Sequence, residues 1–169
     1  MSEISQYTES LHEECGVFGM YDKTGETDMV NAVYSALYAL QHRGQEAAGI
    51  AVSDKKQILV YKDVGLVSQV FNDQNLAALR GDLAIGHVRY ATTGVRSWEN
   101  AQPTLGPTPF GTVALAHNGN LTNTTELMAD VRKLSGADLR GELGRGSSTD
   151  TSVITAMFGL QTQATSLEE

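Results

Sequence analysis

The sequence is poor in cysteine, in positive charge and in long apolar runs. Cys15 is the only cysteine among 169 residues, so no disulfide can form within the chain, as is usual in a reducing compartment. Twelve Lys and Arg residues stand against twenty Asp and Glu, and the net charge of −8 disfavours non-specific nucleic-acid binding. The longest apolar-rich stretch, residues 29–40, is too short to span a bilayer. We therefore expect a soluble, cytoplasmic protein with no nucleic-acid or membrane partner.

The chain has the length of about one domain, and its character changes at Cys15. Residues 1–14 are polar and acidic, without the basic start and apolar stretch of a secretory signal. Apolar patterns predict strands at 15–21, 47–54, 57–63, 82–92 and 111–119. Helical spacing predicts helices at 28–41, 72–79, 123–134 and 150–160. Residues 93–110 and 135–148, rich in Gly, Pro or Ser, are predicted loops. Strands at the centre with helices outside indicate an α+β layered sandwich.

Cys15 is the first candidate for chemistry. A lone intracellular cysteine is most often a small buried hydrophobic residue, and that interpretation stays open here. None of the four histidines stands in a cysteine-protease signature. If residues 1–14 were removed, however, the α-amine of Cys15, which titrates near ~7.7–8.0, would be able to take the thiol proton. One residue would then supply both nucleophile and base.

Three further motifs place polar residues beside turns. Arg89, in GHVRYATTG, lies in or just after a predicted strand, and a surface ion pair would explain it equally well. Asn118 and Gly119, in AHNGN, offer a side-chain amide and a backbone N–H, the parts of an oxyanion hole, although Asn-Gly also marks ordinary tight turns. Asp150 starts a predicted helix within SSTDT, where a capping role is common. Each motif alone is a weak signal.

Taken in order, six motifs form a much more specific pattern: CGVFG, QHRGQEAAGI, GLVSQVF, IGHVRYATTG, LAHNGNLTN and SSTDT. They resemble the glutaminase domain of the amidophosphoribosyltransferase family, class II glutamine amidotransferases that are N-terminal-nucleophile hydrolases. The resemblance runs from Cys15 to about Leu160. The acidic leader ending in EEC is similar to the short propeptide of this family. QHRGQE separates the chain from glucosamine-6-phosphate synthase and asparagine synthetase, whose cysteine directly follows the initiator methionine.

The resemblance implies a four-layer αββα sandwich, incomplete at its C-terminal end, whose glutaminase part begins at Cys15 and occupies residues 15–169. It implies that residues 1–14 are a propeptide, and that their removal exposes Cys15 as the nucleophile that attacks the glutamine amide. It further implies that Asn118 and Gly119 form the oxyanion hole. Arg89 would bind the α-carboxylate of glutamine through a forked contact.

Other roles follow from the same resemblance. Asp150 is implied to be the partner of the α-ammonium group of glutamine, and Thr92 a further substrate contact. Arg43 is implied to orient the site. We expect His87 and His117 to be buried and hydrogen-bonded, without a catalytic role.

The resemblance also implies what this segment does not contain. Chains of the family continue through more strands of the sandwich into a phosphoribosyltransferase domain, which is absent here. We therefore expect only the glutamine-hydrolysing half-reaction, with amination of phosphoribosyl pyrophosphate in purine synthesis left to the full-length enzyme. We expect no cofactor within the chain. Mg²⁺ and the iron–sulfur cluster of some members would belong to the C-terminal part, and homo-oligomers to the full-length enzyme.

Two alternatives stay open at this point. The chain would also fit the glutaminase part of a related amidotransferase that aminates another acceptor, because such relatives share the Arg and Asn-Gly motifs. It would also fit a catalytically inert fragment that serves as a folding unit or interaction module.

Overall fold

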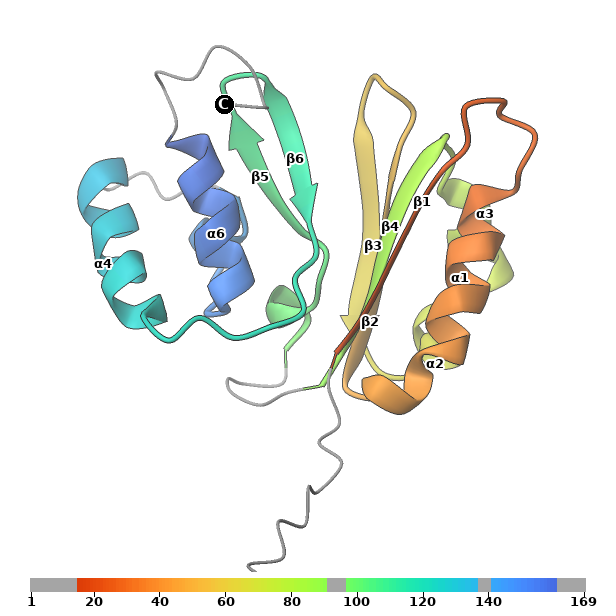
Figure 1. The fold of residues 1–169 in the computed structure, drawn as a ribbon, viewed down its shortest axis with the longest axis horizontal. Helices are drawn as coiled ribbons and strands as arrows, with labels where there is room; N and C mark the ends of the chain where they lie inside the picture. The colour runs from red at the N-terminus through yellow and green to blue at the C-terminus, as the bar shows by residue number, and fades with distance from the viewer. Residues whose placement is uncertain (1–14, 91–96, 137–140, 161–169) are drawn as a thin grey trace, which may run out of the picture.

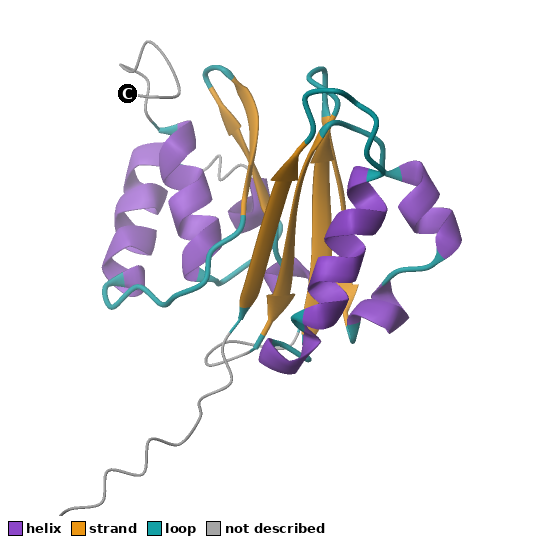
Figure 2. Cartoon of the chain, turned by 45° about the vertical axis from the view of Figure 1, so that its right-hand side comes forward, coloured by secondary structure: helices purple, strands orange, loops and turns teal. Residues whose placement is uncertain are grey.

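The computed structural model describes residues 15–90, 97–136 and 141–160, and it arranges them in four layers (Figure 1). Two antiparallel sheets face each other, and helices cover the outer face of each (Figure 2). The chain thus has the α+β fold of an αββα sandwich, which confirms the expected fold class. None of the helices in these ranges is long and apolar enough to cross a membrane.

The first sheet has four strands in the order β1-β4-β2-β3, which are β1 (Gly16–Tyr21), β4 (Leu83–Arg89), β2 (Ala47–Ser53) and β3 (Ile58–Val64). Its outer face carries α1 (Met29–Ala39), α2 (Val67–Val70) and α3 (Asp73–Ala78). The second sheet pairs β5 (Thr104–Thr108) with β6 (Gly111–Leu115). Its helices are α4 (Thr124–Ser135), α5 (Gly141–Gly144) and α6 (Asp150–Gly159). Two 3₁₀ turns, η1 (Gln41–Arg43) and η2 (Trp98–Asn100), lie in the connections.

The larger hydrophobic core lies between α1 and the first sheet. Asp28 begins α1 by accepting a hydrogen bond from the Asn31 N–H, as the sequence predicts for a helix cap. Val33 and Leu37, four residues apart on one face of the helix, are fully buried. They pack directly on β4, because a Cβ at Gly86 would lie only 2.7 Å from Val33 Cγ1. The small residue thus allows the helix to approach the strand closely.

A second glycine brings the two sheets together. Gly49 lies in the middle of β2, which is buried along nearly its whole length. A Cβ at Gly49 would lie 2.1 Å from the carbonyl oxygen of Gln102, just before β5. The backbone of Gln102 therefore rests directly on β2. This contact fixes where the chain leaves the first sheet and enters the second.

The structure differs from the sequence-based expectation in four places. Strand β5 lies inside the predicted loop 93–110. Its Pro107 stands opposite Thr112 on β6, and among the described strands β6 is the only neighbour of β5. A proline is tolerated in such an edge strand, which is why the proline did not prevent a strand here. Strand β6 ends at Leu115 and not at residue 119, so the Asn-Gly pair follows the strand in irregular chain. Helix α5 forms inside the predicted loop 135–148, where Glu142 and Leu143 are buried. Helix α2 was not predicted at all.

Candidate active site

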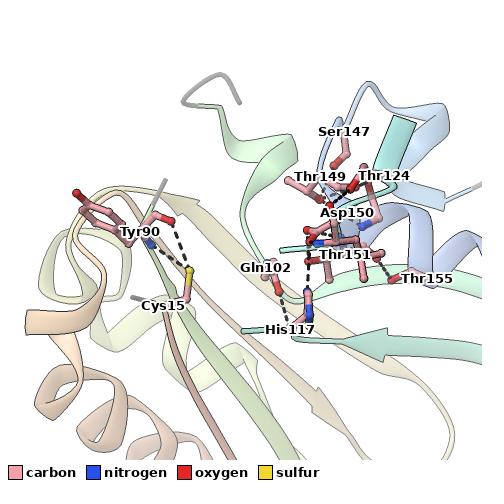
Figure 3. A network of polar contacts seen from close by, with 12 residues as sticks. Cys15, Tyr90, Gln102, His117, Thr124, Ser147, Thr149, Asp150, Thr151 and Thr155 are labelled. Carbon is pink, nitrogen blue, oxygen red and sulfur yellow. Dashed lines mark hydrogen bonds and ion pairs between the residues drawn. The ribbon is translucent and has the colours of Figure 1, made fainter. Parts of the chain in front are cut away.

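Cys15 lies at the end of the first sheet, immediately before β1. The β1–β4 register sets Gly16 opposite Val88, so Cys15 comes beside the end of β4. Its Sγ lies 3.3 Å from the backbone nitrogen of Tyr90 and 3.5 Å from the Tyr90 carbonyl oxygen (Figure 3). Burial raises the pKa of the Cys15 thiol, and the Tyr90 hydrogen bond and the positive charge of Arg89 only partly offset this. The neutral thiol is therefore favoured, and a nucleophilic role requires a base.

The carbonyl oxygen of Cys15 accepts two hydrogen bonds from distant parts of the chain. Arg43, in η1, donates from Nε at 3.3 Å. Asn118, beyond β6, donates from Nδ2 at 2.6 Å. The backbone of the candidate nucleophile is thus held by residues from both halves of the sandwich. This is where the structure places Arg43 and Asn118, whose roles in orienting the site and in the oxyanion hole stay predictions.

Arg89 is the last residue of β4, and its side chain is 6% exposed. Strand alternation directs Arg89 away from α1, since Val88 belongs to the core beneath that helix. Its Nη1 lies 2.5 Å from Oε1 of Glu46, and the two residues also share a backbone hydrogen bond of 3.0 Å. The surface ion pair that the sequence allowed is therefore a buried one, and the guanidinium is held in place by Glu46.

Asp150 connects the start of α6 to the segment after the Asn-Gly pair. Its Oδ2 accepts a hydrogen bond of 2.9 Å from the Leu121 N–H and lies 3.6 Å from His117 Nδ1 (Figure 3). The cap of α6 is the preceding residue, Thr149, whose hydroxyl accepts from the Ser152 N–H. The capping role that the sequence allowed for Asp150 is therefore wrong. Asp150 instead lines a cavity that it shares with Cys15.

One cavity of about 300 Å³ brings several of these residues together. Cys15, Arg89, Gly119 and Asp150 all contribute to its wall. The remaining lining is polar and comes mainly from Tyr90, Gln102, His117, Asn120, Thr122, Thr124, Thr125, Ser148 and Thr149. Asn118 contacts Cys15 beside this cavity without lining it. Thr92 lies outside the described residues. A pocket of this size and polarity suits a small polar molecule.

The two histidines between the sheets depart from expectation. His87 is fully buried, yet neither ring nitrogen has a hydrogen-bond partner among the described residues. Burial lowers its pKa to about 3, and the nearby backbone of His117 only partly offsets this. His117 is half-buried, lines the cavity, and has no hydrogen bond at Nδ1 among the described residues. The expected burial of His87 is therefore confirmed, but the expected hydrogen bonds of its ring are wrong, and His117 is only half-buried.

Sequence reasoning missed three contributors to the site. Glu46 accepts a hydrogen bond from Arg89, and the only sequence feature that could have indicated this role is its place at the end of the QHRGQE motif. Gln102 lines the cavity and accepts a hydrogen bond of 2.7 Å from the His117 N–H through Oε1. Ser148 lines the cavity from a segment predicted to be a loop. No group of three or more His, Cys, Asp or Glu side chains in the described ranges is arranged to hold a metal ion.

The sequence is closely similar to curated amidophosphoribosyltransferases. It is 61% identical over 124 residues to that of Mycobacterium tuberculosis, covering 73% of this chain and 23% of the relative. It is 44% identical over 144 residues to that of Methanocaldococcus jannaschii, covering 85% of this chain and 29% of the relative. The solved glutamine phosphoribosylpyrophosphate amidotransferase of B. subtilis matches with a TM-score of 0.72 and 37% identity, over 90% of this chain and 30% of that one. No protein-family model matches the chain.

The chain belongs to the amidophosphoribosyltransferase family. It spans about a quarter of the length of the curated relatives that it matches. Both of these relatives are amidophosphoribosyltransferases by name.

Proposed function

We propose that the chain is the glutaminase part of an amidophosphoribosyltransferase, with Cys15 as the nucleophile that releases ammonia from glutamine. The observation that carries this proposal is the shared cavity, whose wall contains Cys15 together with the buried Arg89, the partly exposed carboxylate of Asp150 and Gly119. A cation, an anion and a thiol in the wall of one cavity match the carboxylate, ammonium and amide of glutamine. The family membership supports the same substrate.

In the proposed reaction, residues 1–14 are first removed, so that Cys15 becomes the N-terminal residue with a free α-amine. This amine takes the thiol proton, and the thiolate sulfur attacks the side-chain amide carbon of glutamine. The electron pair of the C=O bond moves to oxygen, where Asn118 and the Gly119 N–H stabilise the charge. When the pair returns, the C–N bond breaks and the proton leaves with ammonia, giving a thioester. Water then attacks the thioester carbon, and glutamate and the thiol are released.

Substrate recognition in this scheme divides between the two sheets. Arg89, at the end of the first sheet, binds the α-carboxylate, because a planar guanidinium suits a forked contact. Asp150, at the start of α6 beyond the second sheet, binds the α-ammonium. Arg43 holds the Cys15 carbonyl and orients the nucleophile. Thr92 is proposed as a further substrate contact on the basis of the family resemblance alone.

The wider activity belongs to a longer polypeptide than the one described here. In it, we propose that ammonia displaces diphosphate from phosphoribosyl pyrophosphate, that the enzyme acts in the cytoplasm, and that it forms homo-oligomers. The name of the B. subtilis enzyme, a glutamine phosphoribosylpyrophosphate amidotransferase, supports the acceptor. We propose no cofactor for residues 15–169. Mg²⁺ and any iron–sulfur cluster would be bound beyond them.

The proposal is tested by incubating the purified chain with L-glutamine and measuring glutamate and ammonia. Cys15→Ala is the control, because it removes the sulfur that forms the thioester and leaves the neighbouring polar residues in place. We expect equal amounts of glutamate and ammonia from the wild-type chain and none above background from the variant. Equal release from both chains would refute Cys15 as the nucleophile.

A further inference from the structure

We infer that Asn100 is a positioning residue that sets Asp150 relative to Arg89, and that it thereby selects substrates carrying both an α-ammonium and an α-carboxylate group. The inference rests on the proposed function, because it assigns those two substrate groups to Asp150 and Arg89. Asn100 itself does not line the cavity, and it acts through the chain that leads into α6.

The side chain of Asn100 is buried, at 2% exposure, and binds two consecutive serines. Its Oδ1 accepts from the Ser148 N–H at 3.0 Å and from the Ser147 hydroxyl at 3.2 Å. Its Nδ2 donates to Ser148 Oγ at 3.4 Å. A single asparagine thus fixes the backbone two residues before Asp150. Ser147 and Thr149 also lie within hydrogen-bond distance, at 3.3 Å between their hydroxyl oxygens, which continues the connection to the cap of α6.

The backbone around Asn100 is anchored to the first sheet. Lys62, on β3, donates from Nζ to the Ala101 carbonyl at 2.7 Å, and Gly49 on β2 leaves room for the Gln102 backbone. The same Nζ lies 3.1 Å from Glu142 Oε1 on α5, and both side chains are almost fully buried. Burial lowers the pKa of Lys62, and the Glu142 charge offsets part of this. Two neighbouring connections therefore tie the first sheet to the segment that precedes Asp150.

This arrangement matters because Arg89 lines the cavity from the end of β4, whereas Asp150 lines it from the start of α6. In an α-amino acid the carboxylate and ammonium groups are attached to one carbon, so their partners must be held at a fixed separation. Hydrophobic packing holds α6 from Val153 onwards, whereas the two serines before the cap of α6 are held by polar contacts with Asn100. The hydrogen bonds of Asn100 join the two residues before the cap of α6 to the chain between β4 and β5. A shift of about 1 Å in such a group can lower turnover by roughly 100-fold.

The test compares L-glutamine with glutaramate, which has the same carboxylate and side-chain amide but no α-ammonium group. Asn100→Leu removes the hydrogen bonds to Ser147 and Ser148 and keeps a branched side chain of similar size. We expect kcat/KM for glutamine to fall by about 10- to 100-fold, while kcat/KM for glutaramate changes by less than about 3-fold. Asn100→Asp keeps both acceptor positions, for the Ser148 N–H and the Ser147 hydroxyl, and should restore part of the preference for glutamine.

Two controls separate positioning from a general loss of structure. Asn75→Ala removes a comparable pair of side-chain hydrogen bonds at α3, far from the cavity, and should leave the ratio of the two substrates unchanged. In an Asp150→Asn background, adding Asn100→Leu should produce no further loss of selectivity, because the group it positions is already disabled.

The outcomes distinguish this inference from the proposed function. An equal fall for both substrates in Asn100→Leu, or no fall for either, overturns the inference while glutamine hydrolysis by the wild type still supports the function. A selective fall that is additive with Asp150→Asn also overturns it. If the wild-type chain hydrolyses neither substrate, the proposed function fails and the inference fails with it.

Discussion

Replacing Arg89 by lysine tests whether this buried guanidinium binds the substrate carboxylate. The variant keeps a positive charge next to Glu46, so the fold should persist, whereas alanine would leave Glu46 without its partner at a cost of about 3–5 kcal/mol. Lysine cannot reproduce the planar fork, because its single ammonium has to serve both Glu46 and the substrate. Loss of one charge-assisted hydrogen bond is worth about 1.5–3 kcal/mol, which corresponds to a fall of about 10- to 150-fold in kcat/KM for glutamine.

The assay is glutamate release over a range of glutamine concentrations, with thermal unfolding measured on the same samples. We expect a raised KM and a melting temperature close to that of the wild type. Arg80→Lys is the matched control, since Arg80 is exposed on the surface and donates only to the nearby Ala77 carbonyl in the described contacts. If Arg89→Lys and Arg80→Lys both hydrolyse glutamine with wild-type kinetics, Arg89 does not bind the carboxylate and its contact with Glu46 is purely structural.

Three further predictions concern the nucleophile, the oxyanion and the core. Intact-mass analysis should show an active protein that begins at Cys15; full activity in a protein that retains residues 1–14 would exclude its α-amine as the base. Asn118→Ala should lower kcat by about 100- to 1,000-fold with little change in KM, and an effect on KM alone would indicate a turn role instead. His87, with its pKa of about 3, stays neutral when folded but takes up a proton when unfolded below about pH 6.5. Stability should therefore decrease as pH falls from about 6.5 towards 3, by up to about 1.4 kcal/mol per pH unit, and His87→Gln should reduce this slope in unfolding measurements made at several pH values.

The elements that sequence predicts well are those whose apolar pattern matches a single buried face. Helix α1 is an example, because Val33 and Leu37 recur at helical spacing after the cap at Asp28. Strand β2 is another, since its apolar run is buried on both faces between the other layers. In both cases local propensity and tertiary packing favour the same structure.

The elements that sequence misses depend on partners far away in the chain. Helix α5 contains two glycines in four residues, which argues against a helix, and it forms around Glu142 because Lys62 on β3 pairs with that carboxylate inside the protein. The same holds in the site. Arg89 could be proposed from its motif, but its burial against Glu46 requires the pairing of β2 with β4, which sets Ala47 opposite Arg89. Side-chain partners that meet only through sheet register cannot be derived from local pattern.

The two hydrogen bonds on the Cys15 carbonyl bear on maturation. A newly formed N-terminus is ordinarily poorly ordered, because its first residues are no longer attached to a preceding peptide. Here Arg43 and Asn118 donate hydrogen bonds to the carbonyl oxygen of Cys15, and the backbone of Tyr90 contacts the Cys15 sulfur. None of these contacts involves the leader. Cleavage before Cys15 would therefore free the amine while the rest of the residue stays docked, so that the terminus would be ready for catalysis as soon as it is made.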